Sequence, residues 1–292
     1  MMRRIPAALS FLSALLLCSG CGSTAHARKL ATAGAAYGHA TDVLLRVTQE
    51  TAADADSARL LSEAQGLTRD DRRALLEKHG IVSETVADLE RLRRHARLLA
   101  RYFEALGRLA AEGADAEAGD AIGAVATALN RLGQELTGSK LLTTAERDLI
   151  SQTARLSVET VRRSAVDREL SARASAIDRE LRVQQTLLDA VRRKLRADLE
   201  SVTVLGRERD VSRPFLENTI SDPRAWIALR RGYLIAPPAT EGLKEASDAA
   251  SKLRAAWTAF TSRRSDETAQ AALLADLETI LAYAEAVRAL QR

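Results

Sequence analysis

The amino-acid sequence predicts an all-α protein: an elongated antiparallel helical bundle of coiled-coil character, built around one helix of about 60 residues. Three observations support this fold class. Aromatic residues make up only 3% of the 292 residues, and alternating β-branched runs are nearly absent. Apolar residues recur at steps of three and four through most of the chain. Finally, the stretch from Leu141 to Leu205 contains no glycine and no proline.

The segment from Met1 to Cys21 has the pattern of an export signal rather than of a folded element. Arg3 and Arg4 give it a basic start, and the apolar run Ala7–Leu17 follows. This run is too short to span a bilayer, which requires about 20 apolar residues, and it suits a cleaved signal peptide.

Ser19, Gly20 and Cys21 end this segment, and the pattern resembles the signal of a bacterial lipoprotein. The resemblance implies cleavage before Cys21, diacylglycerol on its thiol and a fatty acid such as palmitate on the new amine. Two or more such chains hold a protein stably on a membrane. Lipoprotein signals usually carry Leu where this chain has Cys18. The next residue is Gly22 rather than Asp, which by the same resemblance favours the outer membrane, with the protein body in the periplasm.

A second cleavage site competes with the first. Ala25, His26 and Ala27 form an A-x-A motif, and cleavage after Ala27 would leave a soluble periplasmic protein without cysteine. The lipoprotein alternative divides the chain into a signal peptide (1–20), a lipidated tether (21–29), a long helical bundle (30–211), and an aromatic- and proline-rich connector with a C-terminal helical hairpin packed on the same bundle (212–292).

Periodicity and end signals predict the first helices. Gly34 and Gly38 weaken the start of the first one. Thr68 is placed as an N-cap and Gly80 as a C-terminal stop for a short second one. The predicted helices cover about 30–64, 69–79, 83–112 and 115–136. The last of these carries a heptad seam of Ile122, Val125, Leu129, Leu132 and Leu136.

Thr144 is predicted to cap the longest helix, which continues to about residue 205 as a rod of roughly 90 Å. Within it, Ser164–Leu170 recurs eleven residues later as Ser175–Leu181, a period that favours a nearly straight packing stripe. The stripe comprises Val166, Ile177, Leu188 and Leu199. The Asp-Arg-Glu run in each copy is interpreted as an exposed face with i,i+4 ion pairs, such as Glu169 with Arg173.

The segment 212–240 interrupts this pattern with prolines and aromatic residues. We predict a turn, a short helix over about 222–233 and a rigid exit at Pro237-Pro238, followed by helices over about 241–261 and 266–290. Trp, Tyr and Arg dominate protein-binding hot spots. The candidate protein-binding residues are therefore Phe215, Trp226, Arg230, Arg231 and Tyr233. Alternatively, the aromatic rings of Trp226 and Tyr233 plug the end of the bundle.

No pattern in the sequence indicates catalysis. His39, His79 and His95 are far apart and lack the spacing of metal ligands, so each is predicted at the surface or at a helix end. A glycine-rich phosphate loop and a nucleophile elbow are also missing. We therefore predict no catalytic residue, no metal site and no cofactor. The 43 basic and 39 acidic residues nearly balance, which argues against a nucleic-acid-binding protein.

These observations lead to a functional hypothesis without an enzymatic activity. We expect an envelope lipoprotein that is held to the membrane by its lipid anchor and acts as a helical scaffold or adaptor for another envelope protein. Apolar stripes left over on the long helix would allow a homo-oligomer. Two alternatives stay open: an immunity lipoprotein that inhibits a toxin, and an envelope hydrolase with an unrecognised site.

Overall fold

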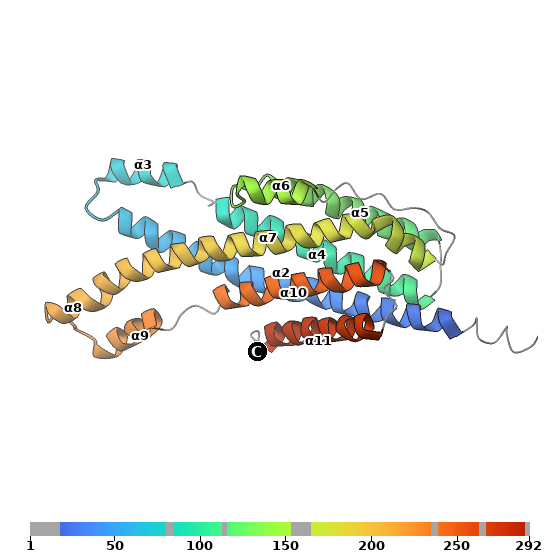
Figure 1. Ribbon diagram of the computed structural model, residues 1–292. Helices are drawn as coiled ribbons and strands as arrows, with labels where there is room; N and C mark the ends of the chain where they lie inside the picture. The colour runs from blue at the N-terminus through green and yellow to red at the C-terminus, as the bar shows by residue number, and fades with distance from the viewer. Residues whose placement is uncertain are drawn as a thin grey trace, which may run out of the picture.

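The computed structural model describes residues 18–79, 84–112, 116–152, 165–234, 239–262 and 267–289. In these ranges the chain forms helices and short turns without a strand, which confirms the all-α prediction. Figure 1 shows an elongated bundle whose long helices run roughly along one axis. Most of the predicted signal peptide, residues 1–17, and the Pro237-Pro238 exit lie outside the described residues.

Most helix boundaries agree with the prediction because end signals and glycine or proline residues define them. The bundle helices are α2 (Cys18–Glu63), α3 (Arg69–His79), α4 (Glu84–Glu112), α5 (Ala116–Thr137), α6 (Thr144–Gln152), α7 (Ala165–Arg207), α10 (Ala239–Thr261) and α11 (Glu267–Ala289). Thr68 caps α3, since its hydroxyl accepts the amide of Asp71 at 3.3 Å. Thr143, rather than Thr144, caps α6: its amide donates to the Glu146 carboxylate at 2.8 Å and its hydroxyl accepts the Glu146 amide.

The predicted tether of residues 21–29 is helical in the structure, because α2 runs without interruption from Cys18 to Glu63. Ala27 and Leu30 are fully buried in the core. The prediction was wrong here because small alanine side chains, which give no strong apolar stripe, make the contacts.

Close packing against α4 explains the two glycines near the start of α2. A Cβ added to Gly34 would lie 2.3 Å from Cγ of Phe103, and one added to Gly38 would lie 2.7 Å from the carbonyl oxygen of Ala96. The α2–α4 pair is the most extensive helix contact in the described part of the chain. The glycines therefore admit a neighbouring helix, and the helical propensity that they lose is offset by this packing.

The core contains both predicted spacings of apolar residues, the heptad on α5 and the eleven-residue period on α7. Ile122, Leu129, Leu132 and Leu136 are buried along α5, with Val125 partly buried against the same core. On α7, Ile177 and Leu188 are buried and Leu199 packs against the core, at the predicted eleven-residue spacing. The side chain of Val166 lies outside the described residues.

The C-terminal hairpin closes the bundle. Helix α10 packs on α7 and α2, and α11 packs on α2 and α10. Trp257 of α10 is fully buried, with its ring centre 5.9 Å from that of Phe103 and 6.1 Å from that of Tyr102. Its indole N–H donates to the carbonyl oxygen of Ala174 on α7 at 2.9 Å. This aromatic cluster joins α4, α7 and α10.

The predicted single helix of about 60 residues is replaced by two elements, α6 and α7. The carboxylate of Glu146 on α6 lies 2.6 Å from the guanidinium of Arg193 on α7. In one straight helix, the 47-residue separation would place them about 70 Å apart. The longest described helices are instead α2, with 46 residues, and α7, with 43. A segment without glycine or proline permits a helix, but burial of an apolar face decides where the helix ends.

The repeated Asp-Arg-Glu runs are only partly exposed. Glu169 pairs with Arg173 at 3.4 Å, as predicted for an i,i+4 pair. In the second copy, Asp178 accepts a hydrogen bond from Arg254 of α10 at 2.8 Å, and Glu180 is 1% exposed. The interpretation as a solvated face was therefore wrong for the second copy, where the acidic residues lie between helices.

Candidate functional site

The connector folds into a compact turn at one end of the bundle. After α7 the chain continues through a π-helical segment, η2 (Glu208–Ser212), and the short α8 (Arg213–Leu216). It reverses at Asn218, whose φ of 55° is in the left-handed region that Asn tolerates. Helix α9 (Pro223–Leu234) then begins with Pro at its first position, and the Asp222 carboxylate accepts the amide of Arg224 at 2.9 Å. These local features reverse the chain, so that α9 packs back against η2 and α7.

The structure brings two of the predicted binding residues, Phe215 and Trp226, into direct contact. Their rings stack with centres 5.8 Å apart and an interplanar angle of 22°. The indole N–H of Trp226 also donates to the carbonyl oxygen of Val211 in η2 at 3.2 Å. Trp226 is thereby fixed in orientation while Phe215 stays 64% exposed.

Tyr233 holds the other end of α9 against η2 and the end of α7. Its hydroxyl donates to the Asp210 carboxylate at 2.5 Å, and Asp210 also pairs with Arg209 at 2.6 Å. Hydrogen bonds from Arg209 and Tyr233 hold the pKa of Asp210 below its ordinary value, while burial and Asp210 raise the pKa of Tyr233. A Cβ on Gly206 would lie 2.4 Å from the Tyr233 hydroxyl, so glycine is needed for this approach.

Arg230 and Arg231 complete the predicted set on the outside of α9, and both are exposed. Helix α9 has no buried residue and packs against η2 and α7. Trp226 therefore rests on η2 and α8, and Tyr233 rests on η2 and the end of α7. Neither side chain is buried as a plug of the bundle would be.

Large apolar side chains are exposed around this turn. Among the described residues, six of the twelve exposed large hydrophobic side chains lie between residues 204 and 234, which concentrates them at this end of the molecule. We call the outer part of this region the α8–α9 surface; it comprises Phe215, Leu216, Trp226, Ile227, Arg230 and Arg231. Contiguous exposed apolar residues with arginines beside them are typical of binding surfaces.

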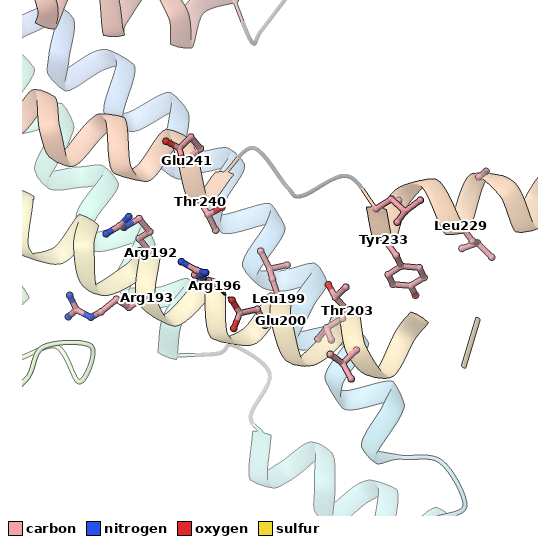
Figure 2. A pocket seen from close by; sticks show the side chains of 15 residues that line it. Arg192, Arg193, Arg196, Leu199, Glu200, Thr203, Leu229, Tyr233, Thr240 and Glu241 are labelled. Carbon is pink, nitrogen blue, oxygen red and sulfur yellow. Dashed lines mark hydrogen bonds and ion pairs between the residues drawn. The ribbon is translucent and has the colours of Figure 1, made fainter. Parts of the chain in front are cut away.

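A cleft of about 1040 Å³ lies on the inner side of α9, between this helix, α7 and the start of α10 (Figure 2). Tyr233 was predicted to belong to a binding site, whereas the cleft itself was not predicted. Its lining consists of Arg192, Arg193, Arg196, Leu199, Glu200, Val202, Thr203, Val204, Ala228, Leu229, Gly232, Tyr233, Leu234, Thr240 and Glu241. Among the described residues that line it there is no serine, histidine or cysteine, and Glu200 is bound to Arg196 at 2.8 Å.

The buried histidine His95 was predicted to lie at the surface or at a helix end. His95 is 0% exposed; its Nδ1 lies 2.6 Å from Oε1 of Gln184 and its Nε2 lies 3.1 Å from Oε2 of Glu180. Arg179 pairs with the other oxygen of Glu180 at 2.6 Å. His95 does not line the cleft, and its contacts join α4 to α7. His39 is exposed as predicted, with Glu104 at 2.7 Å, and the side chain of His79 lies outside the described residues.

Within the ranges that the structure describes, no cluster of three or more His, Cys, Asp or Glu residues is placed to hold a metal ion. Of the helices in those ranges, none is both long and apolar enough to cross a bilayer.

Comparison with known proteins assigns the chain to no family. No protein-family model, curated protein or solved structure matches it. The fold and the site therefore define it as an all-α bundle that carries an exposed apolar surface and an open cleft at one end.

Proposed function

We propose that this protein is an envelope lipoprotein that works as a membrane-tethered helical adaptor. A lipid on Cys21 anchors the start of α2 to the outer membrane, with the body in the periplasm. The α8–α9 surface binds another envelope protein. The proposal assigns no catalytic step to the chain.

One observation carries this proposal: the α8–α9 surface and the start of α2 lie at opposite ends of the bundle (Figure 1). A protein held by Cys21 would present Phe215, Leu216 and Ile227 away from its anchor, and these side chains are 64%, 77% and 51% exposed. Burial of exposed apolar area contributes roughly 25 cal/mol per Å² to binding, before the entropy that association loses. The surface therefore offers the anchors that a protein interface needs.

The burial of Ala27 supports the lipoprotein form over the soluble form. Ala27 is fully buried in the core cluster. Cleavage after Ala27 would remove this side chain and the helical turns before it, whereas cleavage before Cys21 keeps them. A mature chain that starts at Cys21 thus retains the whole of the described core.

Photo-crosslinking in intact cells tests the surface. A photoreactive amino acid at Leu216 or Ile227 is expected to give a discrete adduct with one envelope protein, identified by mass spectrometry. The matched control is Val47 on α2, which is also aliphatic and is 38% exposed. Phe215→Glu should abolish the adduct from Leu216, because a charge would replace the exposed ring beside it. Equal adducts from Val47 and Leu216, or none from Leu216 and Ile227, would refute the proposed interface.

A further inference from the structure

The cleft between α7 and α9 has two chemically different ends. Figure 2 shows Arg192, Arg193 and Arg196 near Thr240 and Glu241 at the start of α10, whereas Leu229 lies at the far end, on α9. Three arginines outnumber Glu200 and Glu241 in the lining, so the cleft carries a net positive charge at one end and is apolar at the other. Its volume of about 1040 Å³ is at the upper limit of small-molecule sites, which span about 300–1,000 Å³.

Arg192 supplies a positive charge that no carboxylate of the described residues neutralises in an ion pair. Arg193 pairs with Glu146 and Arg196 pairs with Glu200. Arg192 forms no ion pair with a carboxylate of the described residues, and its Nε is buried without a hydrogen-bond partner. Buried donors in proteins are nearly always bonded, and a guanidinium matches carboxylate and phosphate oxygens. This end of the cleft is therefore suited to an anionic group.

At the other end of the cleft, the apolar side chains are exposed to solvent. Leu229 and Leu234 of α9 are 49% and 61% exposed, and Val204 of α7 is 59% exposed. An acyl chain along them would gain roughly 0.8 kcal/mol for each methylene that it buries. A small polar anion would leave these side chains in water, and an uncharged hydrocarbon would leave Arg192 unpaired. Both ends are satisfied only by a molecule with an anionic head and a hydrocarbon tail.

We infer that this cleft binds an anionic single-chain amphiphile, with the head group at Arg192 and the acyl chain between α7 and α9. A fatty acid and a lysophospholipid share this chemistry. The inference goes beyond the adaptor proposal and does not depend on it, because the α8–α9 surface and the cleft lie on different sides of α9.

A binding titration tests the inference. The probe is dansylamino-undecanoic acid, added to the purified full chain carrying Cys21→Ala, so that no lipid of its own is present. We expect saturable fluorescence enhancement, and displacement by oleate or by lysophosphatidylglycerol distinguishes a free fatty acid from a lysophospholipid. Neither inorganic phosphate nor oleyl alcohol should displace the probe. Arg192→Ala should weaken binding at least tenfold.

Two further variants separate binding from folding. Leu229→Glu changes an exposed residue on a helix without buried residues, so the core stays intact while the acyl end becomes charged. It should also weaken probe binding at least tenfold. Arg94→Ala, an exposed arginine on α4 outside the cleft, should leave binding unchanged. The inference is overturned by non-saturable binding, by displacement with oleyl alcohol as strong as with oleate, or by equal affinity in Arg192→Ala, Leu229→Glu and Arg94→Ala.

Discussion

Gly34→Ala is expected to lower the free energy of unfolding by about 2–3 kcal/mol, in the upper part of the usual range for overpacking a close-packed interior. The added Cβ would lie 2.3–2.5 Å from three atoms of the Phe103 ring. This ring cannot move aside easily, because Phe103 is fully buried and packs edge-on against Tyr102 and Trp257. Urea denaturation followed by circular dichroism measures the change as a lower midpoint at an unchanged slope.

Gly107→Ala is the matched control, because it places the same methyl group at the same α2–α4 interface. Its Cβ would lie 3.4 Å from the Cβ of Ala31, an ordinary contact. Alanine also has the higher helix propensity, by up to about 1 kcal/mol. We expect Gly107→Ala to be neutral or stabilising. If Gly34→Ala unfolds at the same urea concentration as the control, the close approach of α2 and α4 is not as described.

His95→Ala is expected to destabilise the bundle by about 3 kcal/mol, since it removes a buried side chain and two hydrogen bonds together. Gln184 would lose its ring partner, and Glu180 would keep only Arg179 while remaining buried. A buried carboxylate that loses a partner is poorly compensated by the protein interior. Thermal and urea unfolding of the variant measure this loss.

The control for His95 is His39, which also pairs with a glutamate but at the surface. The side chains of His39 and Glu104 are 59% and 46% exposed. Exposed ion pairs typically contribute less than about 1 kcal/mol, so His39→Ala should have little effect. Similar losses in the two variants would show that the His95 cluster does not contribute to the core.

The sequence predicted most helices because their ends carry local signals. Thr68 and Pro223 mark helix starts, and glycine or proline residues separate the long elements. The period of eleven residues also correctly placed Ile177 and Leu188 on the buried face of α7. Such information is contained in short segments, which is why sequence reading recovers it.

The predictions that were wrong concern contacts between segments that lie far apart in the sequence. The role of Gly34 depends on Phe103, and the burial of His95 depends on Glu180, which lies 85 residues away. The separation of α6 from α7 is visible only from the contact between Glu146 and Arg193, which lie 47 residues apart. No local pattern encodes these pairings, since they arise only when the helices pack together.

The candidate site was also predictable only in part: its neighbouring residues could be predicted from the sequence, but the cleft between distant helices could not. Residue type alone pointed to Phe215, Trp226, Arg230, Arg231 and Tyr233, which lie close together in sequence. The cleft could not be predicted, because it forms only where α9 folds back against α7 and α10 begins beside them.

The mass of the mature N-terminus tests the central claim, a lipid-tethered adaptor, most directly. The account predicts that protein isolated from the producing cells begins at Cys21, carries its acyl groups and stays with the membrane fraction, and that Cys21→Ala abolishes this processing. An unlipidated chain that begins at Arg28 and is recovered free of membranes would contradict the anchor, and with it the adaptor function proposed for the α8–α9 surface.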